Sequence, residues 1–309
     1  MVDGLRVAAL LLNWQRADLT LRCLADLLAV GDVTMHVFVL DNGSGAGEVA
    51  ALQRGIADLA AGPHRVELVA LPENRGFTGG MNAGFRRATA AGLPFALVLN
   101  NDLRLPADFL LPLVNALQDD VRLAAVGPTV LHPDGTVWAQ GGERAFTANG
   151  LRLRGHRGAP ASRAAGPEEV GFLPCACVLF RMSSVAAVGG FDDAYFMYWE
   201  DVDLCERLRA RGGGIVWLPW VAVEHASGQS SGGGRSPLRK FLMACNQVRY
   251  LRARGTVMGW VAWLCADVLA WPLTLVAWPR AAWAKLRGMV AGLCGHAASA
   301  ADVAVWLRR

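Results

Sequence analysis

The feature that most constrains the fold is a series of short, uninterrupted apolar runs in the first third of the chain. The runs are residues 6–12, 35–40, 66–71 and 95–99, and segments with helical periodicity separate them at 17–29, 47–59 and 80–91. An apolar run without polar alternation is typical of a strand that is buried on both faces, as in a parallel sheet. The order βαβαβαβ therefore predicts an α/β fold with a mostly parallel central sheet flanked by helices.

Polar side chains follow these predicted strands at the point where each strand ends. Asn13, Asp41, Asn74 and Asp102 each stand just past one strand. Asn and Asp are also ordinary turn and helix-capping residues, so any one of them alone has a structural explanation. Because ligands of open α/β sheets bind at the carboxyl ends of the strands, four such residues at one edge favour a binding site.

A second candidate site lies in residues 191–205, FDDAYFMYWEDVDLC, where Glu200, Asp201 and Asp203 follow the most aromatic segment of the chain. Carboxylates beside bulky rings are partly desolvated, which raises their pKa and suits them to proton transfer. The alternative is that these acids open a helix over 201–211 and stabilise its positive end. The segment alone is compatible with both a catalytic centre and a helix start.

The remainder of the first 235 residues continues the mixed pattern. We expect helices at 106–117 and 183–189, strands at 123–128, 171–181, 215–218 and 221–223, and a hairpin insertion with an exposed loop at 129–169. The last of these strands ends in Glu224-His225. Residues 226–236, ASGQSSGGGRS, are rich in Gly and Ser, which favours either a mobile flap beside the site or a plain linker.

Taken in order, several segments resemble the inverting glycosyltransferases of family 2, which have the GT-A fold and use nucleotide-diphosphate sugars. The segments are LLNWQR, VLDNGS, ENRGFTGGMNAGF, LVLNNDLRL, GGFDDAYFMYWEDVDLCERLRARG and VEHASGQSS, and they extend from residue 6 to residue 231. Within that family the chain is most similar to the bacterial rhamnosyltransferase-type branch. The resemblance implies a catalytic domain at 1–235 that moves a sugar, best guessed as L-rhamnose from dTDP-rhamnose, to a hydroxyl of a lipid-linked or cell-surface glycan.

The resemblance also implies which residues bind the dTDP- or UDP-linked donor. They are Asn13, Asp41, Asn74, Gly76, Gly80, Asn82, Asn100 and Asn101. Asn13 and Asp41 match positions that hold the ribose and the base, and Asp41 would accept a hydrogen bond from the imide N–H that uracil and thymine share. The four residues that follow Asp41 in this set match a glycine-rich loop that lets the backbone approach the nucleotide.

A metal site is implied by the same resemblance. Asn100-Asn101-Asp102 takes the place of the family's metal-binding DxD, and only its last acid is present. Asp102 would bind Mg²⁺ or Mn²⁺ with His225 as the second protein ligand, and diphosphate oxygens and water would complete the shell. Hard divalent cations prefer such oxygen-rich ligation. Without the neighbouring motifs, a lone His at a strand end is more often structural.

Asp201 matches the family's catalytic base, which removes the proton of the acceptor hydroxyl while the metal stabilises the departing nucleoside diphosphate. Glu200 and Trp199 would support the acceptor site, Asp203 would be structural, and the aromatic residues before them would form the wall of the acceptor pocket. The chain departs from the family pattern at Cys175, in CACVLFR, where Gly is common. This departure concerns the acceptor pocket and not the reaction.

The last 75 residues differ from the rest in charge and in aromatic content. Residues 1–234 hold 19 Lys/Arg and 24 Asp/Glu, whereas residues 235–309 hold 11 basic and 2 acidic residues. Basic and aromatic residues together indicate either nucleic acid or an anionic membrane surface, and the long apolar runs here favour the membrane over nucleic acid. We therefore expect residues 236–309 to form a basic, Trp-rich helical extension that associates with a membrane.

Residues 256–278 are long enough to span a bilayer. Four tryptophans fall within one arc of such a helix: Trp260, Trp263, Trp271 and Trp278. Asp267 lies in the same arc and Pro272 should break or kink the helix, so we favour helices that lie on the membrane surface with Trp at headgroup level. The alternatives are a helical pair that packs back onto the catalytic domain, for example at a homodimer interface, and a true span.

The N-terminus enters strand-like sequence by Leu5 without a signal peptide, and the seven cysteines form no zinc-binding pattern. We therefore expect a cytoplasmic protein on the inner face of the cell membrane, where enzyme and polyprenyl-linked acceptor would share a surface. Two other functions compete with the transferase. A sugar nucleotidyltransferase would usually show a GxGxR-type loop, which LLNWQR lacks, and an inactive sugar-nucleotide-binding scaffold is disfavoured by Asp201 and His225.

Overall fold

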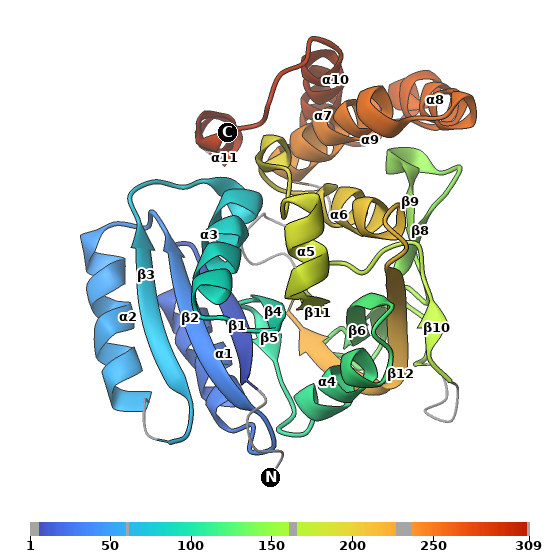
Figure 1. Cartoon of the computed structure of the whole chain (residues 1–309). Helices are drawn as coiled ribbons and strands as arrows, with labels where there is room; N and C mark the ends of the chain where they lie inside the picture. The colour runs from blue at the N-terminus through green and yellow to red at the C-terminus, as the bar shows by residue number, and fades with distance from the viewer. Residues whose placement is uncertain (1–5, 60–61, 161–165, 227–235, 308–309) are drawn as a thin grey trace.

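The computed structural model describes residues 6–59, 62–160, 166–226 and 236–307. The centre of the predicted flap, 227–235, lies outside this range. The described residues form one large mixed sheet covered by helices on both faces, with a layer of C-terminal helices at one end (Figure 1). The predicted α/β fold with flanking helices and a C-terminal helical extension is therefore confirmed.

The sheet has the strand order β10-β12-β6-β11-β4-β1-β2-β3. Its strands are β1 (Arg6–Asn13), β2 (Thr34–Asn42), β3 (Arg65–Leu71), β4 (Phe95–Asn100), β6 (Leu123–Leu131), β10 (Glu168–Glu169), β11 (Cys177–Arg181) and β12 (Gly214–His225), with β5 (Leu103–Arg104) and β7 (Val137–Ala139) at its margins. The β3-β2-β1-β4 half is parallel, as is β6 with β12, whereas β11 is antiparallel to both neighbours. The register places Asn13 beside Asp41 at the carboxyl ends of β1 and β2, as the strand-end pattern predicts.

Helices cover both faces of this sheet. They are α1 (Ala17–Leu28), α2 (Ala46–Leu59), α3 (Gly76–Ala90), α4 (Leu110–Asp119), α5 (Met182–Val188) and α6 (Glu200–Arg209). Ala9 and Leu11 of β1 belong to the apolar cluster that contains α1, α2 and α4, whereas Ala8 and Leu10 belong to the cluster that contains α3, α5 and α6. Successive residues of β1 are thus buried on opposite faces, which explains why its sequence is apolar without alternation.

The start of α3 differs from the sequence prediction. The helix begins at Gly76, four residues early, so the predicted glycine-rich loop is the first turn of a helix. Two side chains hold this opening, because Asn74 Oδ1 accepts the N–H of Gly76 at 2.9 Å and Asn42 Oδ1 accepts the N–H of Arg75 at 3.0 Å. Gly76 has a φ of +72°, and a Cβ there would lie 2.4 Å from the carbonyl oxygen of Phe196.

Three other predicted boundaries are wrong for local reasons. β11 covers only the second half of the predicted strand 171–181, because Pro174 has no N–H to donate to a ladder. α4 begins at Leu110 instead of residue 106, after a turn that closes on Pro106. β12 joins the predicted strands 215–218 and 221–223 into one strand with a shift in register between them.

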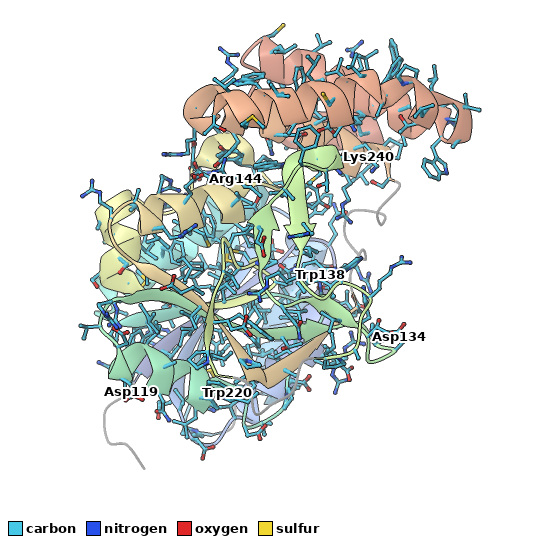
Figure 2. The ribbon with its side chains drawn as sticks, turned by 90° about the vertical axis from the view of Figure 1, so that its right-hand side faces the viewer. Asp119, Asp134, Trp138, Arg144, Trp220 and Lys240 are labelled. Atoms are coloured by element: carbon cyan, nitrogen blue, oxygen red, sulfur yellow. The ribbon has the colours of Figure 1, made fainter. Side chains whose placement is uncertain are left out.

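The predicted hairpin insertion is present. β8 (Gly142–Arg144) pairs antiparallel with β9 (Leu151–Leu153), and a short 3-10 turn, Ala148–Gly150, lies between them. Figure 2 shows Arg144 on this hairpin directly beneath the C-terminal helices, while Asp119 and Trp220 lie at the opposite end of the molecule. The hairpin therefore connects the central sheet to the helical layer.

The helical layer is built around the close contact of two helices. Its elements are α7 (Pro237–Arg254), α8 (Val257–Trp263), a π-helical turn (Leu264–Leu269), α9 (Trp271–Ala277), α10 (Pro279–Leu293) and α11 (Ala300–Leu307). A Cβ at Gly288 of α10 would lie 2.3 Å from the carbonyl oxygen of Phe241 in α7, so this approach requires glycine. The predicted break at Pro272 is confirmed, since the helix changes to a π turn and restarts as α9.

Asp267, predicted to share an arc with the tryptophans, is fully buried inside this layer. Its carboxylate accepts hydrogen bonds from Lys285 Nζ at 2.7 Å, Gln247 Nε2 at 2.8 Å and the peptide N–H of Asn149 at 2.9 Å. These partners come from α10, α7 and the β8–β9 hairpin. The one acidic group of the apolar segment is thus neutralised on the inner side.

The outer side of that segment is apolar and exposed. Val257–Ala277 is the one helical segment of the described residues that is long and apolar enough to cross a membrane, with a mean hydropathy of 1.6. Only 11% of its most apolar window is buried. Val257, Leu273 and Val276 are 80%, 77% and 90% exposed.

Candidate active site

A cavity of about 230 Å³ opens at the carboxyl ends of β1, β2 and β4. Its walls come from these strand ends, from residues 174–176, from the loop 196–201 that enters α6, and from the C-terminal helices α7 and α11. The predicted site residues that line it are Asn74, Gly76, Asn100, Asn101, Asp102, Glu200, Asp201 and His225. The strand ends and the acidic segment, which the sequence presents as two candidate sites, therefore form one site.

Asp102 and His225 lie side by side at one wall of this cavity. β5 pairs with β12 so that Leu103 stands opposite His225, which brings Asp102 Oδ1 within 3.0 Å of His225 Nε2. Both side chains are buried, and the ring of Trp138 packs edge-on against the imidazole with 4.9 Å between ring centroids. Asn100 Nδ2 lies 3.4 Å from the same Nε2. The sequence places these two residues more than 120 positions apart, and the sheet brings them into contact.

This pair fits a divalent cation. A carboxylate oxygen and an imidazole nitrogen both bind such ions, and neighbouring ligands of an octahedral ion held at about 2.1 Å are about 3 Å apart. The observed separation of 3.0 Å matches this requirement. Within the described residues no third His, Cys, Asp or Glu joins the pair, so other oxygen donors would have to complete the shell.

Asn13 and Asp41 lie at the predicted edge but are fully buried and do not line the cavity. Asn13 Nδ2 donates to Asp41 Oδ1 at 2.8 Å, and the peptide N–H of Ser44 donates to Asp41 Oδ2 at 3.0 Å. The Thr20 hydroxyl donates to Asn13 Oδ1 at 2.7 Å and in turn accepts from Asn101 Nδ2 at 2.9 Å. These bonds join β1, β2, α1 and the Asn101 turn. Each Asp41 carboxylate oxygen accepts one of them, so the predicted contact with a nucleobase would use a remaining lone pair of that carboxylate.

Asn42, which the sequence prediction did not single out, faces the cavity beside Asp41. Its Nδ2 donates to Asn74 Oδ1 and to the carbonyl oxygen of Gly76, both at 3.0 Å. The Asn-Gly-Ser turn after β2 was its only signal, and a turn signal does not reveal which of two adjacent polar side chains faces a ligand. Asn42 fixes the first turn of α3 at the edge of the cavity.

Besides Asn13 and Asp41, two further residues predicted to bind the donor do not line this cavity. Gly80 faces β1, where a Cβ would lie 2.5 Å from Leu12 Cδ1, so it permits close packing of α3 on the sheet. Asn82 Nδ2 donates to the carbonyl oxygen of Phe191 and to Asp193 Oδ1, the latter at 2.7 Å. Asn82 Oδ1 accepts the N–H of Phe191. Asn82 lines a separate groove between α3 and α5.

The loop into α6 has an unusual backbone. Phe196, Tyr198 and Trp199 have φ values of 60°, 72° and 72°, a region that costs a non-glycine residue about 1–3 kcal/mol. Phe196 and Tyr198 line the cavity, as expected for an aromatic wall. Trp199 turns away from it, is 3% exposed, and packs on Tyr250 of α7 with 4.8 Å between ring centroids. The structure therefore places Trp199 behind the predicted acceptor pocket.

Glu200 and Asp201 face the cavity at the start of α6 without any cationic partner among the described residues. Burial raises the pKa of Asp201 to about 6, while the peptide N–H groups of Val202 and Cys175 favour its ionised form. Burial and the neighbouring Asp201 charge hold the pKa of Glu200 well above its usual range. At neutral pH the pair therefore consists of an ionised Asp201, still open to the cavity, beside a Glu200 whose pKa is raised.

Asp203 has a different environment from these two acids. It is buried and accepts hydrogen bonds from Arg207 Nε at 2.7 Å and from Arg254 Nε at 2.9 Å. Arg207 lies one turn along α6, and Arg254 lies at the end of α7. The structure thus places Asp203 in a link between α6 and α7, in keeping with the structural role expected for it.

Comparison with known proteins connects this site to one family. The chain matches the family model described as Glycosyl transferase family 2 over residues 11–189. It is 30% identical over 264 residues to an N-acetylglucosaminyl-diphospho-decaprenol L-rhamnosyltransferase of Mycobacterium tuberculosis, covering 77% of this chain and 81% of that protein. A 49-residue stretch is 49% identical to the rhamnosyltransferase WbbL of Escherichia coli, covering 16% of this chain and 17% of that protein.

Solved structures show the same fold at low sequence identity. A mannosyltransferase from Pyrobaculum calidifontis in complex with GDP-Man and Mn²⁺ aligns with a TM-score of 0.57 and 18% identity over 98% of this chain and 79% of that one. GalNAc-T7 with UDP, GalNAc and Mn²⁺ aligns with a TM-score of 0.58 and 13% identity over 82% of this chain and 48% of that one, so the chain spans about half of GalNAc-T7. These likenesses concern the fold, which is that of GT-A glycosyltransferases.

Proposed function

Because this chain belongs to glycosyltransferase family 2, we propose that it transfers L-rhamnose from dTDP-rhamnose to a hydroxyl of a polyprenyl-diphosphate-linked glycan. The observation that carries the transferase chemistry is Asp201, a carboxylate with a raised pKa and no ion-pair partner within the described part of the chain, on the same cavity as the Asp102–His225 pair. The sugar and the lipid-linked acceptor are suggested by the mycobacterial relative, which is an N-acetylglucosaminyl-diphospho-decaprenol L-rhamnosyltransferase.

The residues of the cavity have separate roles in the reaction. The acceptor oxygen attacks the anomeric carbon, and the bond from that carbon to the diphosphate breaks with its electrons going to the diphosphate. Asp201, ionised above pH 6, takes the hydroxyl proton as the new bond forms. Glu200 lies beside it in the same cavity, with its pKa held above the usual range, and would support the acceptor. Attack from the side opposite the leaving group inverts the anomeric centre.

Asp102 and His225 would hold the divalent cation, Mg²⁺ or Mn²⁺. Such an ion supplies positive charge where the departing diphosphate becomes more negative. Asn100 contacts the pair and Asn101 is tied to Thr20, so the backbone that carries Asp102 is fixed to α1. This arrangement prepares the ligands before a donor arrives.

Donor-dependent thermal stabilisation tests the donor assignment. With Mg²⁺ present, dTDP-rhamnose should raise the midpoint of unfolding more than UDP-galactofuranose or UDP-N-acetylglucosamine, because a ligand that binds only the folded state stabilises it by about 2.7 kcal/mol at one hundred times its Kd. A larger shift with either UDP sugar would contradict the rhamnose assignment. Release of nucleoside diphosphate only after addition of acceptor would separate a transferase from a nucleotidyltransferase and from an inactive scaffold.

We also propose that residues 257–277 lie on the inner face of the cell membrane. The support is an outward face that is apolar and exposed, together with an acid that points inward to Lys285. Basic residues of the same extension would meet anionic lipid. A helix pinned by its one carboxylate to α7 and α10 favours surface attachment over a span, because a span would have to release that carboxylate.

Vesicle sedimentation tests this attachment. Vesicles of phosphatidylcholine with phosphatidylglycerol should pellet the wild-type chain, and the double variant Leu273→Glu/Val276→Glu should stay in the supernatant. Val121→Glu is the matched control, since Val121 is 78% exposed and lies two residues from Asp119 at the far end of the molecule (Figure 2). Equal sedimentation of both variants would contradict the proposal, and a loss of dimers instead would indicate a homodimer interface.

A further inference from the structure

We infer that Asn246 of α7 is a positioning residue for the transfer reaction, because it holds the backbone of residues 195–199 in the conformation that presents Glu200 and Asp201 to the cavity. The inference rests on the proposed role of Asp201. It assigns to the C-terminal extension a part in the chemistry, in addition to any part in membrane binding.

One buried amide contacts three carbonyl groups of this loop. Asn246 is 0% exposed, and its Nδ2 donates to the carbonyl oxygens of Tyr195 at 2.6 Å, Met197 at 2.9 Å and Tyr198 at 2.9 Å. An amide nitrogen carries only two hydrogens, so one of them is shared between two acceptors. The amide is thus fully used as a donor for a single segment.

The strained backbone of the loop allows its three carbonyl groups to point toward the same amide. The positive φ values at Phe196, Tyr198 and Trp199 turn successive peptide planes, so that carbonyl groups which would alternate in a strand face one point. A left-handed run of bulky residues persists only where its surroundings impose it. The Tyr195 carbonyl oxygen also accepts the N–H of Met197, so the loss of the Asn246 amide would chiefly remove the hydrogen bonds to the carbonyl oxygens of Met197 and Tyr198.

Two further contacts fix the same loop and show what it connects. The Phe196 side chain packs with Leu238 and Phe241 of α7 and with Val303 of α11. The Phe196 carbonyl oxygen accepts the N–H of Thr78 at 3.2 Å, in the first turn of α3. The loop therefore lies between the helix that borders the predicted donor site and the helix that carries Asn246. A shift of the loop would move Asp201, which follows Trp199 by two residues.

The neighbouring residue on α7 provides a matched control. Gln247 is also a buried amide, 3% exposed, with an unpartnered side-chain oxygen like that of Asn246, but its Nε2 donates to Asp267 within the helical layer. Replacing Gln247 with Leu therefore removes a buried amide from the same helix without touching the loop. Any effect common to both variants is one of stability.

The test compares Asn246→Leu with Gln247→Leu in the full-length chain. Asn246→Leu should lower kcat by about 10²-fold, the effect of a misplaced catalytic group, with the Kd for donor changed by less than about threefold. Hydrogen exchange at residues 195–201 should be faster in this variant. Gln247→Leu should keep both kcat and the exchange rate of that segment near wild type even where its Tm falls.

Three outcomes decide the matter. Equal kcat and equal exchange at 195–201 in the two variants would overturn the inference. If Asn246→Leu does not fold, Asn246→Ser, which keeps one donor of smaller reach, becomes the deciding variant with the same readouts and an intermediate expected loss. Normal turnover of Asp201→Asn would refute the base assignment instead, and the exchange measurement would still report whether Asn246 holds the loop.

Discussion

Buried carboxylates have ion-pair partners in and beside the helical layer, but those at the start of α6, on the cavity, do not. In the layer, Asp267 is paired with Lys285, and between α6 and α7, Asp203 is paired with two arginines. At the cavity, Glu200 and Asp201 are adjacent, and neither forms an ion pair with a described residue, although Arg239 lines the same cavity. A buried charge without a partner has a raised pKa, whereas a paired one is stabilised in its ionised form. Carboxylates of the first kind suit proton transfer, and those of the second kind hold helices together.

Helix α7 contacts both the cavity loop and the helical layer. Gln247 binds Asp267 on one side of the helix, and Asn246 binds the catalytic loop on the other. Tyr250 of the same helix belongs to the apolar core that contains α3, α5 and α6. The predicted division into a catalytic domain at 1–235 and an extension at 236–309 stays a prediction, and α7 is the element through which the two parts would be joined.

The largest expected effect is on catalysis, from Asp201→Asn. Loss of a general base typically costs about 10²- to 10⁴-fold in rate, so transfer should fall by at least that lower figure while donor binding stays nearly intact. Product formation and donor-dependent thermal stabilisation measure the two effects. Asp108→Asn, an exposed carboxylate outside the cavity, is the control. Near-normal turnover of Asp201→Asn would contradict the assignment of proton transfer to the unpaired carboxylate at the cavity.

The second prediction concerns the paired carboxylate. Lys285→Met leaves Asp267 buried without its cation, which should lower the free energy of unfolding by about 3–5 kcal/mol. Urea denaturation measures this loss, and kcat of the folded fraction should change little. Arg122→Met is the control, because its pair with Asp120 is exposed and such pairs contribute at most about 1 kcal/mol. A loss for Lys285→Met no larger than the control would contradict the structural role of Asp267.

The third prediction contrasts the stability effects of two Asp→Asn changes. Burial raises the folded pKa of Asp201 above its unfolded value, so its ionisation destabilises the folded state progressively as pH rises from about 4 to about 6, and the full loss is present above that. Asp201→Asn should therefore raise the free energy of unfolding at pH 8, by roughly 1–3 kcal/mol. Asp267→Asn should lower it. Thermal unfolding of the two variants at pH 8 and pH 5 measures both signs, and the Asp201→Asn gain should be about half as large at pH 5 as at pH 8.

The smallest expected effect is on metal use. His225→Ala removes one of two protein ligands, so the Mg²⁺ or Mn²⁺ concentration for half-maximal transfer should rise by about tenfold or more. A metal titration after treatment with EDTA measures this. His296→Ala in the helical layer, far from Asp102 in sequence and paired with Asp302, should leave the titration unchanged. An identical metal requirement for both variants would argue against the Asp102–His225 site.

Much of the framework follows from local sequence. The apolar runs predict the strands of the parallel half because both faces of each are buried, and the polar residues after them predict the edge where Asn13 meets Asp41. The register of a parallel sheet makes such strand ends coincide. The fold and the location of the candidate site could therefore be predicted together.

What the sequence does not show is the direction of side chains and the long-range contacts. Asn13 and Asp41 are buried in mutual hydrogen bonds while Asn42 faces the cavity, and turn chemistry favours all three equally. Asn246 lies in the middle of an amphipathic helix, about 50 residues from the loop it holds, and nothing in its own segment marks it. These features depend on how α7 packs, which no local pattern encodes.

The pH dependence of kcat/KM tests the central claim most directly. If Asp201 is the base and burial raises its pKa to about 6, activity should be constant above pH 7, half-maximal near pH 6 and nearly lost at pH 5. A solvent-exposed Asp would keep the enzyme active down to about pH 4. Activity that stays constant from pH 7 to pH 5, with the protein still folded and donor still bound, would contradict the account.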